Sequence, residues 1–552
     1  MTKSITRRQF VKTTSLAGMG VLLGCSVSSR FDIVIKNGIV IDGTGAPGRA
    51  ADVGIKGDLI TAIGNLENAS AKSVIDASDK VVCPGFIDIH THTDTELLVN
   101  PLAESKIRQG VTTEVAGNCG STPFPLNEKD RTSLEENLRE KYGLSVPWTD
   151  IRGFLEAVRN ATPSINYATF TGHGDLRAYV AGKHDVRATP EQLREMQHLL
   201  EQSMEYGSLG LSTGLEYAPG SYADTDELIA LNEVVAKHNG VYATHMRNED
   251  DTVEEAIQEA LTITKSTGVS LQISHLKACN RANWHKVPSM LSMIEKAARD
   301  LPVHADRYPY IAYGTGLTAF LPLWSRQGDT EDVLRRLQDN TDIPKIREYA
   351  NSRGERIGGW DRVVISYCRH SANKQYEGKS IAACAEKNSV PPFEFIRNIL
   401  IEEENRVSIV GFAMDEENLK SVLKNPLVMV GSDGSAVASY GALGEGKPHP
   451  RYYGTFPRVL GKYARDEHLF DLPVAIQKMT SMPAEKLQVK QRGILRENYY
   501  ADIVIFNPDA IIDRATFTAP HHYPAGISHV LVNGAVTIEK EKHTQAKAGR
   551  VI

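Results

Sequence analysis

The amino-acid sequence predicts an α/β fold: a TIM-like (β/α)8 barrel with a small β-sandwich domain formed by both ends of the chain. Short apolar segments alternate with amphipathic helical stretches, such as 190–206 and 252–265, and this alternation is typical of a parallel sheet. Eight apolar segments can be counted, the number that a closed (β/α)8 barrel requires. They are 85–92, 112–118, 165–171, 209–213, 241–246, 271–276, 303–308 and 427–433.

Both ends of the chain carry hairpin patterns instead. Residues 31–41 and 530–538 each surround an Asn-Gly pair, a strong short-range hairpin signal, and 52–63 turns at Lys56-Gly57-Asp58. Short hairpins are unstable alone, so the two ends are expected to pair into one unit. The predicted parts are a signal segment at 1–29, β-sandwich segments at 30–84 and 484–552, and a barrel at 85–483 with an insertion at about 312–425 over the active site.

The first 29 residues are interpreted as an export signal rather than as part of the fold. Arg7 and Arg8 resemble a twin-arginine motif, and the apolar run 16–23 that follows is too short to span a bilayer. Leu22-Leu23-Gly24-Cys25 resembles a lipoprotein cleavage box, which predicts a periplasmic protein with a lipid anchor at Cys25. The alternative is a plain cleaved signal with an incidental cysteine.

Composition excludes several classes of partner. The net charge of −6 gives no basic surface for nucleic acid or anionic lipid, so membrane contact is expected only through Cys25. Six cysteines in 552 residues are too few and too scattered for a disulfide framework. A charged fraction of 24% fits an ordinary globular protein.

Residues able to bind metal follow five of the predicted strands. His90 and His92 are two residues apart at the end of the first strand, so both side chains can reach one ion. Cys119 follows the second strand, and a thiolate ligand favours zinc. Taken singly, each residue is also explained as a packed histidine or a buried cysteine with a structural role. Their shared position at the ends of five strands predicts a metal site instead. The other strand-end residues are His245, His275 and Asp433, while His173 is left open between lining the site and a structural role.

These motifs resemble those of the amidohydrolase superfamily and, within it, those of the N-acyl-D-amino-acid deacylases, or D-aminoacylases. Residues 82–92 are similar to the superfamily signature PGxIDxHxH, and the resemblance extends over roughly 31–545. The more specific motifs are Gly117-Asn118-Cys119-Gly120, Thr244-His245-Met246-Arg247, Ser274-His275-Leu276-Lys277, Gly431-Ser432-Asp433-Gly434 and His449-Pro450-Arg451.

The resemblance implies a role for each strand-end residue. Cys119, His245 and His275 would hold one tightly bound zinc ion. His90 and His92, with Cys119 shared, would form a second and weaker zinc site. Asp433 would be a metal ligand and also the catalytic acid/base.

The function implied by the resemblance is zinc-dependent hydrolysis of the amide bond of N-acyl-D-amino acids, giving a carboxylate and a free D-amino acid. Metal-activated water would attack, with Asp433 as general acid/base. Lys277, Tyr308 and Arg451 would bind the substrate carboxylate. The preference for the D-isomer rests on the resemblance alone. The alternatives are a cyclic amidase, a dipeptidase that cleaves a C-terminal D-residue, or a non-catalytic exported lipoprotein that binds a metal or an amide.

Overall fold

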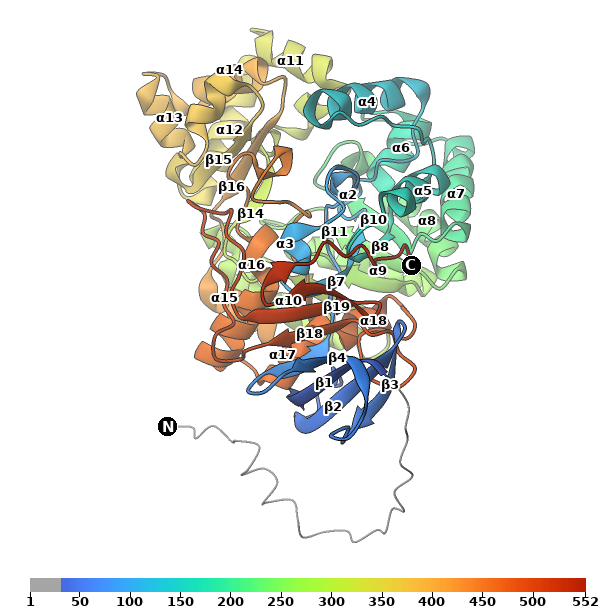
Figure 1. The fold of residues 1–552 in the computed structure, drawn as a ribbon. Helices are drawn as coiled ribbons and strands as arrows, with labels where there is room; N and C mark the ends of the chain where they lie inside the picture. The colour runs from blue at the N-terminus through green and yellow to red at the C-terminus, as the bar shows by residue number, and fades with distance from the viewer. Residues whose placement is uncertain (1–30) are drawn as a thin grey trace.

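The computed structural model describes residues 31–552 (Figure 1). The predicted signal segment 1–29, with Cys25, lies outside the described residues, so export and lipid anchoring stay predictions. Over residues 31–552, no helix combines the length and the apolar character needed to cross a membrane.

The centre of the molecule is a ring of parallel strands, and all eight predicted strands are present. β7 (Val111–Ala116) pairs with β6 (Phe86–Asp88) and β8 (Asn166–Thr169). Six more strands form a second sheet in the order β17-β13-β12-β11-β10-β9. Their bounds are β9 (Thr171–Gly172), β10 (Gly210–Gly214), β11 (Val241–His245), β12 (Ser270–Ile273), β13 (Val303–Arg307) and β17 (Val428–Val430).

Two seams close these sheets into a barrel. β8 and β9 are consecutive parts of one barrel strand, separated by Phe170. The first part pairs with β7 and the second with β10, so this strand joins the two sheets. At the other seam, Thr91 after β6 forms a parallel bridge with Gly434 after β17. The residues that follow β6 and β17 are therefore held side by side, because the closure takes place through them.

Amphipathic helices cover the barrel, as their periodicity predicts. α7 (Pro190–Glu205) starts at a capping box, in which Thr189 accepts a hydrogen bond from the Gln192 backbone N–H and Gln192 accepts one from that of Thr189. Along α9 (Val253–Thr267), buried residues recur every three or four positions and pack against the strands. The other helices before the insertion are α2 (Glu96–Val99), α3 (Glu104–Ile107), α4 (Glu128–Tyr142), α5 (Ile151–Ala161), α6 (His173–Ala181), α8 (Thr225–Lys237) and α10 (Val287–Ala297).

The two chain ends build one nine-stranded sheet, in which β5 (Val81–Pro84) pairs with β18 (Ile503–Phe506). The predicted hairpins at 52–63 and 530–538 are confirmed as β2–β3 and β19–β20. The predicted hairpin at 31–41 is wrong. Residues Phe31–Val40 form the single strand β1, and its Asn-Gly pair is a bulge, where Asn37 has a φ of 66°. The remaining strands are β2 (Arg49–Lys56), β3 (Leu59–Gly64), β4 (Ala71–Asp76), β19 (Ile527–Val532), β20 (Ala535–Glu539) and β21 (Lys542–His543).

The segment between β13 and β17 adds a compact unit with its own hydrophobic core. It contains the antiparallel sheet β14-β16-β15 and lies on the side of the barrel away from the nine-stranded sheet (Figure 1). The last helix of the predicted insertion, α15 (Glu416–Lys424), packs instead on β17 and α10 as a barrel helix. The elements of the unit are β14 (Tyr313–Gly316), α11 (Thr330–Gln338), α12 (Ile343–Ile357), β15 (Val363–Cys368), α13 (Ile381–Lys387), α14 (Pro392–Glu402) and β16 (Val407–Gly411).

A buried polar network joins the C-terminal strands to the barrel. Asp502 forms an ion pair with Arg492, and their side chains are only 4% and 3% exposed. The Asn533 backbone N–H donates to Asp502 Oδ1 at 2.7 Å, and the Asn166 amide at the start of β8 donates to Oδ2 at 3.2 Å. The carboxylate is thus fully hydrogen-bonded, and it depends on Arg492 for charge balance.

Arg492→Met is therefore expected to lower the free energy of unfolding by about 3–5 kcal/mol, because it leaves the Asp502 charge buried without a partner. Urea unfolding followed by circular dichroism measures the change. The matched control is Arg550→Met, since Arg550 pairs with Asp58 at the surface, where the side chains are 47% and 37% exposed, and that change should cost about 1 kcal/mol or less. Equal effects of the two substitutions would contradict the role assigned to the buried pair.

Candidate active site

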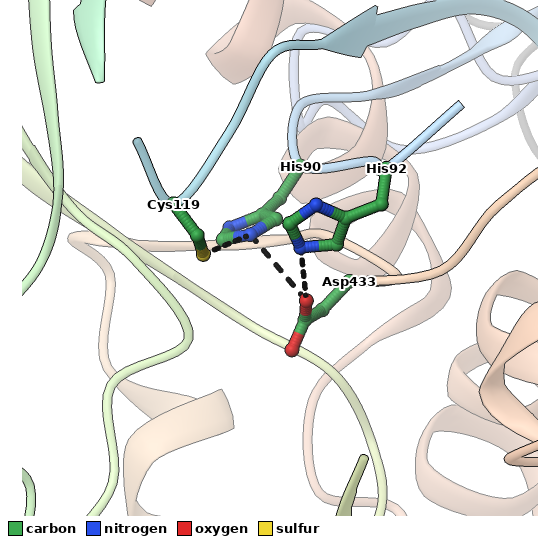
Figure 2. A group of neighbouring side chains, drawn as sticks. All are labelled: His90, His92, Cys119 and Asp433. Carbon is green, nitrogen blue, oxygen red and sulfur yellow. Dashed lines mark hydrogen bonds and ion pairs between the residues drawn. The ribbon is translucent and has the colours of Figure 1, made fainter. Parts of the chain in front are cut away.

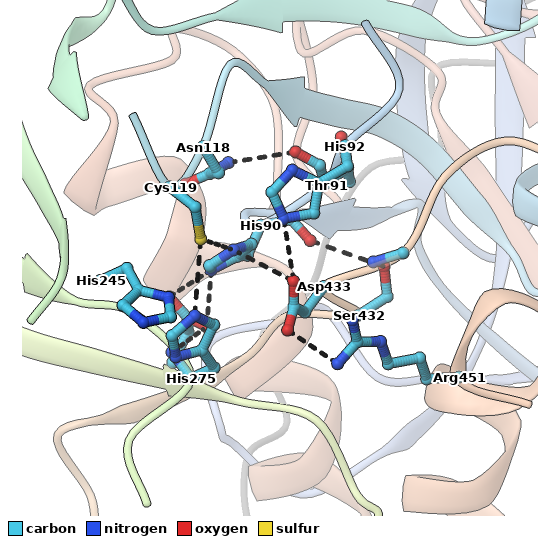
Figure 3. Close-up of polar contacts among 12 residues, drawn as sticks. His90, Thr91, His92, Asn118, Cys119, His245, His275, Ser432, Asp433 and Arg451 are labelled. Atoms are coloured by element: carbon cyan, nitrogen blue, oxygen red, sulfur yellow. Dashed lines mark hydrogen bonds and ion pairs between the residues drawn. The ribbon is translucent and has the colours of Figure 1, made fainter. Parts of the chain in front are cut away.

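Six side chains from five barrel strands converge at the C-terminal end of the ring (Figure 3). These are the strand-end residues that the sequence singles out, and the ring geometry brings all of them together. They are His90 and His92 after β6, Cys119 after β7, His245 at the end of β11, His275 after β12 and Asp433 after β17.

The first group contains His90, His92, Cys119 and Asp433, whose ligand atoms all lie within 4.8 Å of one another. Cys119 Sγ lies 3.4 Å from His90 Nε2, and His92 Nε2 lies 2.9 Å from Asp433 Oδ1. Figure 2 shows the sulfur and the carboxylate approaching the histidines from two sides. One sulfur, two imidazoles and a carboxylate therefore surround a small volume.

The second group contains Cys119, His245 and His275 and uses the same sulfur, which lies 3.4 Å from His275 Nε2. Both ring nitrogens of His245 are buried without a hydrogen-bond partner among residues 31–552. A buried imidazole with two unpaired nitrogens calls for a ligand, since burying unpaired polar atoms costs free energy. A set of thiolate and imidazole donors fits zinc.

Charge in the cluster favours ligand-competent forms of two residues. Burial alone would raise the pKa of the Cys119 thiol, but the positive charges of His90 and His275 lower that pKa well below its usual value. Burial would also raise the pKa of Asp433, yet the Arg451 charge and the hydrogen bond from His92 hold that pKa well below its ordinary range. Both groups are therefore ionised at neutral pH, as metal ligands must be.

Three of the six residues have left-handed backbone conformations that non-glycine residues rarely adopt. The φ angles are 52° at Cys119, 37° at His275 and 50° at Asp433. The His275 backbone N–H donates to Asp306 Oδ1 at 2.9 Å, and the Asp433 N–H donates to the His90 carbonyl at 2.8 Å. Backbone strain of this kind persists where the surroundings enforce it, which is common at functional sites.

Two buried carboxylates orient histidines of the cluster, and the sequence analysis missed both. His90 Nδ1 lies 3.1 Å from Asp306 Oδ1, and His275 Nδ1 lies 2.9 Å from Glu249 Oε1. In the metal-bound form, in which each ring is neutral and its Nδ1 donates to the carboxylate, the Nε2 lone pair would point into the cluster. Asp306 lies in β13 and Glu249 follows β11, so both share the strand-end placement that identified the ligands. Glu249 also forms a further acidic group with Glu216 beside His245.

A buried lysine holds the two loops that carry His90 and Asp433. Lys106 donates to Asp88 Oδ2 at 2.8 Å, to Ser432 Oγ at 2.7 Å and to the Gly434 carbonyl at 3.0 Å. Asp88 accepts in turn from the Ser432 backbone N–H at 2.9 Å. This bridge across the barrel seam fixes His90 and Asp433 relative to each other. Lys106 was not predicted because it lies in the short helix α3, away from the strand ends.

The cluster opens into a pocket of about 530 Å³ between the barrel loops and the insertion. Arg451 and Lys277, two of the predicted substrate-binding residues, line the pocket. Arg451 Nη1 lies 2.7 Å from Asp433 Oδ2, on the side of the carboxylate away from His92 (Figure 3). Lys277 Nζ donates to Glu249 Oε1 at 2.5 Å and also lies 2.9 Å from His275 Nδ1. Lys277 therefore supports a histidine from inside the pocket wall.

Two other predicted substrate-binding residues lie outside the pocket lining. Tyr308 is fully buried, and its ring lies under Arg451, whose guanidinium carbon is 4.7 Å from the ring centroid. His173 is also fully buried, and its Nε2 lies 2.9 Å from Glu227 Oε1 beneath the pocket wall. The His173 imidazole is turned toward Glu227, which favours a structural role, the second of the two alternatives left open by the sequence.

The Cys119 thiolate gives a test of ligand binding that does not depend on activity. In metal-stripped protein at pH 7, Cys119 should react rapidly with iodoacetamide, and added zinc should slow this reaction at least about 10-fold, because the thiolate is the reactive form. Peptide mass spectrometry measures the extent of alkylation at each cysteine. Cys279 is the matched control, since it also lines the pocket but burial raises the pKa of its thiol. Alkylation of Cys119 that saturating zinc leaves unchanged would show that the sulfur is not a ligand.

Glu249→Gln is expected to weaken zinc binding about 10- to 100-fold, because the amide replaces the carboxylate that accepts from His275 Nδ1. Competition with a chromophoric chelator measures the affinity. Glu255→Gln, at an exposed position of α9, serves as the control and should leave the affinity unchanged. Equal affinities for both variants and the wild type would argue against Glu249 as a positioning residue.

Comparisons with known proteins agree with this arrangement. The model of the amidohydrolase family matches residues 73–538. The D-aminoacylase of Alcaligenes xylosoxydans xylosoxydans is 35% identical, with 96% of this chain and 98% of that protein covered. The N-acyl-D-glutamate deacylase of the same organism is 34% identical, with 95% and 97% covered.

Among solved structures, the N-acyl-D-glutamate deacylase from Bordetella bronchiseptica, complexed with zinc and a phosphonate mimic of the reaction's tetrahedral intermediate, has a TM-score of 0.81. It is 33% identical to this chain, and the match covers 95% of this chain and 99% of that one. The chain therefore belongs to the amidohydrolase family and, within it, to the metal-dependent hydrolases of the D-aminoacylase group.

Proposed function

We propose that this protein uses zinc to hydrolyse the amide bond of N-acyl-D-amino acids, releasing a carboxylate and a free D-amino acid. The observation that carries the proposal is the Asp433 carboxylate, held beside a cysteine–histidine cluster at the base of the pocket. The named activities of the two relatives described above support the substrate class.

Cys119, His245 and His275 would hold the tightly bound ion, and His90 and His92 would complete a weaker second site around the shared sulfur. When bound, zinc supplies Lewis acidity toward the amide carbonyl and lowers the pKa of water. The residues around the cluster orient the metal-binding side chains. Asp306 and Glu249 fix the ring positions of His90 and His275, so the ligands need little rearrangement.

Asp433 is assigned the proton transfers. Its Oδ1 faces the histidines, whereas its Oδ2 is paired with Arg451. The Arg451 charge keeps the carboxylate ionised, so Oδ1 carries no proton of its own when the attacking water gives one up. An amide nitrogen leaves poorly unless it is protonated, and Asp433 can return the proton to it. One carboxylate thus acts first as base and then as acid.

Arg451 is assigned to the substrate α-carboxylate. It is buried, lines the pocket and keeps its Nε without a hydrogen-bond partner among the described residues. A guanidinium has five donors, so pairing with Asp433 leaves capacity for a second anion. Lys277 adds positive charge nearby, but its ammonium group already donates hydrogen bonds to Glu249 and to the His275 carbonyl.

The experiment that tests this function is a panel of N-acetyl-D- and N-acetyl-L-amino acids with a hydantoin, assayed with zinc added and with zinc chelated. The expected result is zinc-dependent hydrolysis of the D-isomers with little turnover of the others. Asp433→Asn should lower kcat about 10²- to 10⁴-fold while the zinc ion held by Cys119, His245 and His275 stays bound, because the proton carrier is lost.

Asp300→Asn, at an exposed position after α10, is the matched control and should keep full activity. Near wild-type turnover by Asp433→Asn would remove Asp433 from the mechanism. Hydrolysis of the hydantoin alone would replace the linear-amide proposal with a cyclic amidase.

A further inference from the structure

Five arginine and lysine side chains line the pocket, and four of them have a carboxylate within salt-bridge distance. The exception is Arg326, in the insertion, which has no such partner among residues 31–552. The four ion pairs are Arg247 with Glu259, Lys277 with Glu249, Arg353 with Asp250, and Arg451 with Asp433. Among residues 31–552, Arg326 is therefore the arginine or lysine of the lining without a salt-bridge partner.

Arg326 is also short of hydrogen bonds. Its Nη1 donates to the Glu216 carbonyl at 3.3 Å, and its Nε is buried without a partner. Burial lowers the pKa of this guanidinium. The Glu216 carboxylate forms no salt bridge with Arg326 and is turned toward the cluster, where Oε1 accepts from the Glu249 backbone N–H and Oε2 lies 3.8 Å from His245 Nε2. Leaving a buried donor unpaired costs free energy that a ligand can recover.

Arg326 is linked to the cluster through Glu216, whose carbonyl accepts from Arg326 Nη1 and whose Oε2 lies 3.8 Å from His245 Nε2. The Tyr217 ring packs on His245, with centroids 4.8 Å apart, and its hydroxyl lies 3.3 Å from Thr315 Oγ1 in β14. A Cβ on the neighbouring Gly314 would lie 3.5 Å from Arg451 Nη2. Arg451 and Arg326 thus line the same pocket, and Arg326 contacts the Glu216 carbonyl. Because this pocket contains the cluster, a substrate that extends from the cluster to the insertion wall would meet both guanidinium groups.

We propose that Arg326 is a specificity residue that binds a second carboxylate of the substrate. The inference rests on the proposed function, in which Arg451 takes the α-carboxylate. A planar guanidinium matches a carboxylate through two parallel hydrogen bonds, so an acidic group is the ligand chemistry that fits. The second carboxylate is carried either by the amino-acid side chain or by the acyl group, and the experiment separates these two sources.

The test compares kcat/KM for acidic substrates and their neutral isosteres. One arm uses N-acetyl-D-glutamate against N-acetyl-D-glutamine, and the other uses N-succinyl-D-leucine against N-succinamoyl-D-leucine. In at least one arm the wild type should prefer the acid about 10- to 100-fold, the range for a hydrogen bond to a charged group. Arg326→Gln should abolish that preference through KM, and Arg326→Lys should restore part of it. N-acetyl-D-leucine should be hydrolysed equally by all three proteins, which shows that the variants are folded.

Arg335→Gln, on the exposed face of α11, is the matched control, since its side chain is 66% exposed and pairs with Asp332. It should leave every preference unchanged. The proposal is overturned if the wild type prefers the neutral isostere in both arms, or if Arg326→Gln changes all substrates equally. Failure of the enzyme to hydrolyse any N-acyl-D-amino acid would instead overturn the proposed function, and this inference with it.

Discussion

The Cys119 sulfur is the point on which the rest of the site depends. It is the atom shared by both groups of potential ligands, and it lies 3.4 Å from imidazoles on two different strands. A thiolate at this place needs positive partners, because burial by itself disfavours its charge. The left-handed backbone at residue 119 and the carboxylates behind His90 and His275 therefore serve one purpose, which is to keep a negative sulfur among nitrogen donors.

The strand-end residues could be predicted because a single geometric rule selects them. The C-terminal ends of parallel strands in a closed ring lie at one rim. His90, Cys119 and His275 therefore lie close together, independently of how the helices between them pack. The residues behind the ligands follow no such rule. Lys106 reaches Asp88 from a helix, and Arg326 reaches the pocket from an insertion, so their positions depend on packing between segments remote in sequence.

Two features have physical causes that the local sequence does not contain. The Asn-Gly pair after Lys36 has the composition of a tight turn, but pairing of β1 with β2 and β4 keeps the strand continuous and turns the pair into a bulge. His173 also follows a strand, yet the chain enters α6 at this residue and the imidazole pairs with Glu227. Tertiary partners decide both outcomes.

The pairing of β5 with β18 links the order of synthesis to assembly of the whole molecule. These strands lie at opposite ends of the chain, so the nine-stranded sheet cannot form until nearly all of the protein has left the ribosome. Until then, the edge of β5 has no neighbour on that side and resembles an aggregation-prone strand edge. Newly made chains are thus exposed to misassembly for the full time of translation, and a chain that terminates early lacks the strands that cover this edge.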